Sequence, residues 1–196
     1  MRFSQKEKKD LIFAGIMISL AFAILLSGGF TGFLNENFFI VFVIAFFTAG
    51  IGFLFHELMH KHVAQNYGLF AEFRAFYKML WLAILFSFFG FIIAAPGAVL
   101  IRGNITKEKN GKISLAGPLT NIVLALIFLA LILILNASGI FRAFLNFGLT
   151  INSLLAAFNM LPVGPFDGVK IIAWNKAIYF SVMGFGIILF ILSWFI

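Results

Sequence analysis

Two of the three histidines in this chain lie at positions 56–60, in the sequence HELMH, which has the pattern H-E-x-x-H. In a helix, residues four positions apart project from one face, so His56 and His60 could hold a single metal ion. Glu57 lies one step around that helix and could reach a water molecule bound to the metal. The chemistry of such a set is zinc-assisted hydrolysis. A pair of interfacial histidines beside Lys61 is the alternative, but such groups are costly in apolar surroundings without a shared role.

A catalytic zinc ion uses three protein ligands and keeps one position for water, so H-E-x-x-H leaves one ligand to find. The chain has no cysteine, and the third ligand must therefore be a histidine or a carboxylate. His62 points to nearly the opposite side of the helix from His60. Three glutamates are further candidates. Glu36 lies about a membrane thickness away, Glu72 is close in sequence to the histidines, and Glu108 lies in a charged loop.

Asp167 is a stronger candidate because of its position in the chain. It lies between Pro165 and Gly168, where an apolar run ends and a helix must break. An isolated carboxylate at the end of a membrane span needs a reason to be there. Asp167 could be the third ligand, or it could be the N-cap of a helix that starts at Val169, and the two roles do not exclude each other.

The composition predicts an integral membrane protein, because 63% of the residues are hydrophobic, 11% are charged and 29 are phenylalanine. The 14 lysines and arginines outnumber the 7 acidic residues, but they form short clusters beside apolar runs. That distribution indicates membrane topology, and we expect the lipid bilayer as a partner and no nucleic acid. We expect residues 1–196 to form one membrane-embedded domain, with its core at about 38–170 and no separate soluble domain.

The apolar runs predict about five membrane-spanning helices. The first run follows a cluster of lysines and an arginine at residues 2–9, which places the N-terminus in the cytoplasm. At 1.5 Å per residue, the second run carries His56 back to the inner edge of the membrane. The expected spans cover approximately residues 11–27, 38–55, 113–135, 140–161 and the apolar run after Lys176.

The tract 79–101 is apolar, but Gly90 and the sequence Ala95-Pro96-Gly97 interrupt it. If this tract crossed the membrane, the basic loop 102–112 would lie outside, and Asp167 would be about 30 Å from His56. A tract that enters and leaves the membrane on the cytoplasmic side keeps the basic loop inside and brings Asp167 back to the side of His56. We therefore predict an all-α integral membrane protein with a re-entrant segment at about 70–101, which could contain a β-hairpin, on the cytoplasmic side.

Three motifs occur in a fixed order along the chain. The first is H-E-x-x-H, and the second is the sequence GPLTN at residues 117–121, which ends in Asn121. The third is Asn159-x-x-Pro162-x-x-Pro165-x-Asp167-Gly168. Together these motifs resemble the site-2 protease family of intramembrane zinc metalloproteases, over about residues 38–170.

The resemblance implies one Zn²⁺ per chain, with His56, His60 and Asp167 as its ligands and Glu57 as the catalytic base. It also implies that Asn159 lies near the substrate, which would be a transmembrane protein cleaved within or next to its membrane-spanning segment. The expected location is the cell membrane of a prokaryote, with the active site open to the cytoplasm. From the residues themselves, we expect Asn121 to tie two helices together.

Two other functions were weighed. A zinc or ion transporter would show inverted repeats and several charges along a path, and the sequence shows neither. A catalytically idle membrane scaffold would keep the metal site for structure alone. Such a scaffold has no use for a base, so the presence of Glu57 favours the enzyme.

Overall fold

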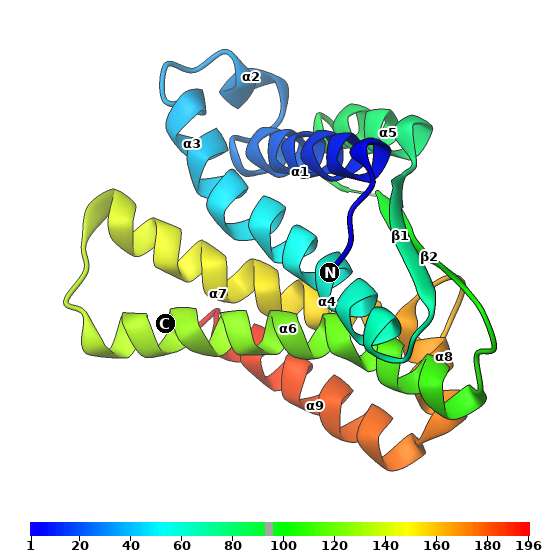
Figure 1. Ribbon diagram of the computed structural model, residues 1–196. Coiled ribbons are helices and arrows are strands. Elements are labelled where there is room, and N and C mark those ends of the chain that lie inside the picture. Colours follow the sequence, from blue (N-terminus) through cyan, green and yellow to red (C-terminus); the bar gives the residue numbers. More distant parts are fainter. Residues whose placement is uncertain (93–95) are drawn as a thin grey trace. The chain divides into compact units, whose positions relative to one another are not determined.

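The computed structural model describes residues 1–92 and 96–196, and most of them are helical (Figure 1). Within this part of the chain, four helices are long and apolar enough to cross a membrane. They are α1 (Gln5–Leu26), the continuous helix Phe38–Asn66, α6 (Lys107–Ile134) and α7 (Gly139–Asn159). The predicted membrane-helical fold class is confirmed. The fifth expected span corresponds to α9 (Lys176–Leu192), whose 17 residues are at the short end of the lengths that can cross.

Two of these helices begin several residues before the apolar runs that predict them. Ser4 is the N-cap of α1, where its side chain accepts a hydrogen bond of 3.1 Å from the backbone N–H of Glu7. Thr106 does the same for α6, accepting from the N–H of Lys109 at 3.2 Å. Each cap satisfies a backbone donor at the helix start, so a polar first turn precedes each span.

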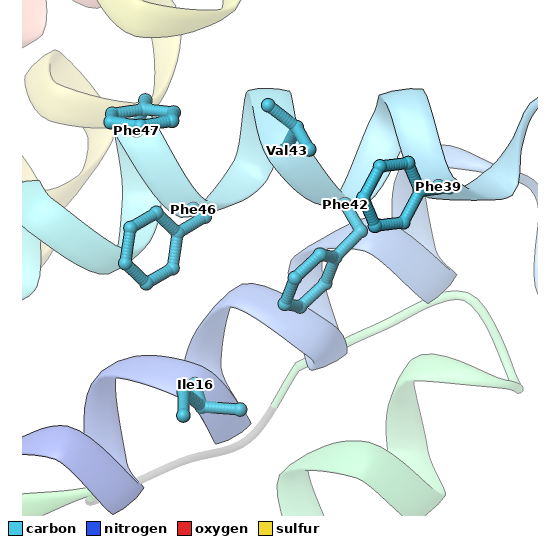
Figure 2. A pocket seen from close by; sticks show the side chains of 6 residues that line it. All are labelled: Ile16, Phe39, Phe42, Val43, Phe46 and Phe47. Atoms are coloured by element: carbon cyan, nitrogen blue, oxygen red, sulfur yellow. The ribbon is translucent and has the colours of Figure 1, made fainter.

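The chain divides into two compact units, of which the first comprises residues 1–54 and 72–100. Its centre is α1, which packs against α3 (Phe38–Ala45), the π-helical turn η1 (Phe46–Gly50) and α5 (Tyr77–Ser87); the short helix α2 is Phe30–Phe33. A Cβ atom at Gly50 would lie 2.2 Å from Ser19 Oγ, so glycine permits the close approach of η1 to α1. An apolar pocket beside this contact is lined by Ile16 of α1 and by aromatic and aliphatic residues of α3 and η1 (Figure 2).

A two-stranded sheet forms from β1 (Phe70–Ala75) and β2 (Gly97–Arg102), with α5 between the strands in sequence. The first turns of α1 hold β1 and the start of α5 through buried carboxylates. Glu7 Oε1 accepts from the backbone N–H of Phe73 at 2.8 Å, and Asp10 Oδ1 accepts from the hydroxyl of Tyr77 at 2.5 Å. The predicted β-hairpin is therefore confirmed.

The tract 79–101 contains a short helix and a strand in its described residues. At 1.5 Å per residue, the 11 residues of α5 extend about 16 Å, which is half the thickness of the hydrocarbon layer. The interruption expected at Ala95 lies outside the described residues, whereas Pro96 and Gly97 lead directly into β2. The length of α5 therefore favours a segment that does not cross.

The second unit comprises residues 55–71 and 101–196, and it contains most of α4 (Ile51–Asn66) with α6, α7, α8 (Asp167–Trp174) and α9. Helix α6 packs along α7 and α8, and α7 packs against α9 (Figure 1). Apolar side chains from α6, α7 and α9 form its core, including Ile122, Leu145, Leu149 and Leu189. All three motifs described above lie in this unit.

The topology can be tested with single cysteines, because the natural chain has none to give background labelling. Asn35 and Asn104 are both exposed, the first before α3 and the second between β2 and α6. If the tract 79–101 does not cross, Asn35→Cys and Asn104→Cys lie on opposite sides of the membrane. We expect a membrane-impermeant thiol reagent to label Asn35→Cys in intact cells and Asn104→Cys only after permeabilisation. Labelling of both variants in intact cells would contradict the non-crossing tract.

Candidate metal centre

The structure brings His56 and His60 of α4 together with Asp167, the first residue of α8. The Nε2 atoms of His56 and His60 lie 3.3 Å and 3.0 Å from the same carboxylate oxygen, Asp167 Oδ2. All three side chains are buried, and their potential ligand atoms lie within 4.8 Å of one another. In the described residues this group could hold a metal ion.

These distances fit a tetrahedral zinc ion. With zinc–nitrogen and zinc–oxygen bonds of about 2.0–2.1 Å, tetrahedral geometry places neighbouring ligand atoms about 3.3 Å apart. The two separations from Asp167 Oδ2, 3.3 Å and 3.0 Å, are close to that value. The donor set of two imidazoles and one carboxylate is also one that zinc accepts in catalytic sites.

Hydrogen bonds at the far side of each imidazole determine which nitrogen faces this group. His60 Nδ1 lies 2.8 Å from the backbone carbonyl of Ile113, which can only accept, so Nδ1 carries the proton. His56 Nδ1 lies 2.6 Å from Asn121 Oδ1, which is likewise an acceptor. Nε2 of each histidine therefore faces Asp167 and is the nitrogen available to a metal, as is common in metal-binding histidines.

The two Nε2 atoms and an oxygen of Asp167 therefore converge in a buried place. Burial raises the pKa of the Asp167 carboxyl, but the electrostatic attraction of His60 and hydrogen bonding with His56 and His60 hold it well below its ordinary value. Asp167 is therefore a carboxylate, whose second oxygen lies 3.5 Å from Lys170 Nζ. A zinc ion bound here would take the place of the protons between the two Nε2 atoms and Asp167 Oδ2.

One face of α6 supports this arrangement. Ile113, Gly117 and Asn121 follow one another at intervals of four residues, and so they lie on the same side of the helix. Ile113 and Asn121 bind the histidines, and Gly117 lies between them. A Cβ atom at Gly117 would be 2.5 Å from Nε2 of both His56 and His60, so only glycine leaves the ligand atoms free.

The remaining residues of the sequence-based prediction lie as follows. Glu57 is buried in the same turn of α4 as the two histidines. Asn159, at the end of α7, is half-buried and donates from Nδ2 to the carbonyl of Leu155 at 2.9 Å. The N-cap role considered for Asp167 is wrong, because α8 begins at Asp167 itself and Phe166 is its N-cap, without a side-chain capping bond.

The rejected candidates for the third ligand have other partners. His62 Nε2 lies 3.1 Å from Asn66 Nδ2 on the same helix. Glu72 belongs to the other unit, where it forms an ion pair of 2.6 Å with Arg74. Glu108 pairs with Lys112 at 2.5 Å on the exposed start of α6, and Glu36 is exposed.

Sequence reasoning missed the residues that orient the ligands. The interhelical role predicted for Asn121 is confirmed, since its Nδ2 donates to Asn152 Oδ1 on α7 at 3.1 Å. Its contact with His56 was not predicted, and neither was any role for Asn152 or for the carbonyl of Ile113. The spacing of Ile113, Gly117 and Asn121 is visible in the sequence, but a backbone carbonyl has no sequence signature.

Comparison with known proteins finds two named relatives of this chain. The chain is 43% identical over 199 residues to the protein named "Putative zinc metalloprotease MJ0611" from Methanocaldococcus jannaschii, covering 98% of each chain. It is also 28% identical over 135 residues to "Zinc metalloprotease MJ0392" of the same organism, covering 68% of this chain and 34% of that protein. No family model matches the sequence. No solved structure matches it either.

The chain belongs to the family of these archaeal zinc metalloproteases, as its near full-length similarity to the first relative shows. Its buried His56, His60 and Asp167 could hold the metal that the names of both relatives specify.

The identity of the third ligand can be tested by metal content. Asp167→Ala removes one of three ligand atoms, and we expect zinc affinity to fall by at least about 100-fold. Glu72→Ala is the matched control, because its carboxylate pairs with Arg74 and not with the histidines. Elemental analysis of both purified variants decides between them. Loss of zinc from Glu72→Ala with retention in Asp167→Ala would refute the assignment.

The space at Gly117 provides a second test. Gly117→Ala places a methyl group 2.5 Å from both Nε2 atoms, so the imidazoles must turn away and zinc affinity should fall about 10-fold or more. Gly184→Ala in α9 is the control, since a Cβ there meets nothing within 4 Å. Competition with a zinc chelator measures the zinc affinity of both variants. Equal zinc affinity in the two variants would show that Gly117 does not border the metal.

Proposed function

We propose that this protein is an intramembrane zinc metalloprotease, similar to site-2 proteases, which hydrolyses peptide bonds within or next to transmembrane segments of other proteins. The observation that carries the proposal is the buried His56, His60 and Asp167 set, which includes residues of a helix of membrane-spanning length and composition. The relatives named as zinc metalloproteases support the reaction class.

In this proposal each residue has a separate task. His56 and His60 bind the zinc ion through Nε2, and Asp167 binds it through Oδ2. When bound, zinc acts as a Lewis acid that polarises the substrate carbonyl and makes water nucleophilic near neutral pH. Glu57 accepts a proton from the attacking water and delivers it to the departing amide nitrogen as the C–N bond breaks.

The carboxylate of Asp167 would also reduce the net charge of a buried metal site. A dication held only by neutral imidazoles would carry its full charge into a medium of low dielectric constant. The anionic oxygen of Asp167 offsets part of that charge. Lys170 Nζ lies 3.5 Å from the other oxygen of Asp167 and places a positive charge beside it.

The substrate is expected to pair with the sheet. A transmembrane helix buries its peptide groups in its own hydrogen bonds, and so its cleavage requires local unwinding with replacement bonds. The backbone N–H of Phe73 in β1 is already bonded to Glu7. In β2, by contrast, Leu100 and Arg102 are exposed. We therefore place an unwound substrate segment along β2, as an added strand.

The distribution of charge supports a cytoplasmic orientation of the N-terminus and of the active-site opening. Basic residues lie before and within the first turns of α1 and at the start of α6, as the positive-inside rule expects of cytoplasmic ends. The lipid bilayer surrounds the apolar helices in this arrangement. The named relatives are archaeal, in keeping with a prokaryotic cell membrane.

The reaction is tested with purified protein and a tagged transmembrane substrate. We expect cleavage that a zinc chelator abolishes. Glu57→Gln preserves the shape of the base but cannot accept a proton, so turnover should fall at least about 100-fold while zinc stays bound. The control is Glu36→Gln, which changes an exposed carboxylate between helices and should cleave normally. A Glu57→Gln enzyme that still cleaves would contradict the role of the base.

Strand pairing is tested on the substrate. Introducing a helix-breaking Gly or Pro near the scissile bond lowers the cost of unwinding, and we expect the rate of cleavage to rise several-fold. An alanine at the same position is the matched control. Uniformly slower cleavage of the Gly and Pro substrates would argue against an unwound, strand-like substrate.

A further inference from the structure

A chain of side-chain amides runs from His56 into the helix bundle. His56 Nδ1 is 2.6 Å from Asn121 Oδ1, and Asn121 Nδ2 donates to Asn152 Oδ1 at 3.1 Å. Asn152 Nδ2 in turn donates to the backbone carbonyl of Gly148 at 2.9 Å. Asn121 and Asn152 are both 0% exposed, on α6 and α7 respectively.

The last member of this chain fixes the direction of all the others. A backbone carbonyl can only accept a hydrogen bond, so Gly148 requires the amide nitrogen of Asn152. Asn152 must then turn its oxygen towards Asn121, and Asn121 must turn its oxygen towards His56. An oxygen at that position requires a proton on His56 Nδ1, which leaves Nε2 as the nitrogen that can bind a metal.

The opposite orientation of Asn121 would disable the metal ligand. A flipped amide would offer its NH₂ group to His56 Nδ1, and the imidazole proton would move to Nε2. Nε2 could then no longer donate an electron pair to a metal. With Asn152 in place, the flipped amide would also set two oxygens against each other in a buried site, which is costly.

We propose that Asn152 is a positioning residue, which acts through Asn121 to hold His56 in the tautomer that binds metal. The inference rests on the proposed zinc site for its purpose, but the hydrogen bonds that carry it do not involve a metal. The competing explanation is that Asn121 and Asn152 only hold α6 and α7 together. The two explanations differ in what a carboxylate at position 121 would do.

The primary test is the zinc affinity of purified variants, measured by competition with a chelator. Asn152→Leu removes the acceptor that orients the Asn121 amide, and we expect the affinity to fall about 10- to 100-fold, as for other residues that orient metal ligands. The control is Ser153→Ala, which removes a buried hydroxyl that donates back to Leu149 of its own helix, and should bind zinc like the parent. Asn152→Ala replaces the leucine variant if the latter does not fold.

The decisive variant is the double substitution Asn121→Asp with Asn152→Leu. Both oxygens of a carboxylate accept hydrogen bonds, so an aspartate keeps the proton on His56 Nδ1 without help from residue 152. We expect its zinc affinity to return to within about threefold of the parent. A role in helix packing alone predicts no such rescue. Parent-like affinity of Asn152→Leu, or an equally weak double variant, would overturn the proposal.

A second readout does not depend on zinc. The ¹⁵N chemical shifts of the His56 side chain in metal-free protein report which nitrogen carries the proton. We expect His56 Nδ1 to be protonated in the parent, whether or not Nε2 shares a second proton with Asp167, and to lose that proton in a fraction of the Asn152→Leu molecules. If the parent binds no zinc, the proposed function fails, whereas the positioning role of Asn152 also fails if the protonation of Nδ1 is the same in both proteins.

Discussion

The structure of the second unit depends on one electrostatic constraint, which is the meeting of three electron-pair donors in a buried place. The two Nε2 atoms lie 3.3 Å and 3.0 Å from the same carboxylate oxygen, and positive charge on the imidazoles or on a metal ion is needed to hold them together. A bound zinc ion would supply that charge in place of the imidazole protons. Three surrounding groups contact these ligands: the carbonyl of Ile113 at His60, the amide of Asn121 at His56 and Lys170 at Asp167.

Helix α6 is the common support of this centre. Its residues 113, 117 and 121 lie along one face, and they orient one imidazole, leave room for the metal and orient the other imidazole. Helix α7 supports α6 in turn through Asn152, and α8 brings Asp167 to the histidines. The metal site is thus a property of the packed bundle, although only α4 carries the recognisable motif.

The features of the fold and of the metal site that depend on neighbouring residues could be predicted from the sequence. The H-E-x-x-H pattern, the apolar runs and the turn before Asp167 can each be recognised from short stretches of the chain. The helix starts at Gln5 and Lys107 were missed because capping by Ser4 and Thr106 extends a helix beyond its apolar run. The pairing of Asn121 with Asn152 joins residues 31 positions apart on different helices, which no local pattern encodes.

The most direct test of the central claim is X-ray absorption at the zinc edge of the purified protein. The account predicts zinc with two imidazole ligands at about 2.0–2.1 Å and oxygen ligands at about 2.0–2.2 Å. The imidazole scattering should fall to that of a single ring in His60→Ala. Protein that binds no zinc under saturating conditions, or zinc surrounded by oxygen alone, would contradict the claim that His56, His60 and Asp167 form the metal centre.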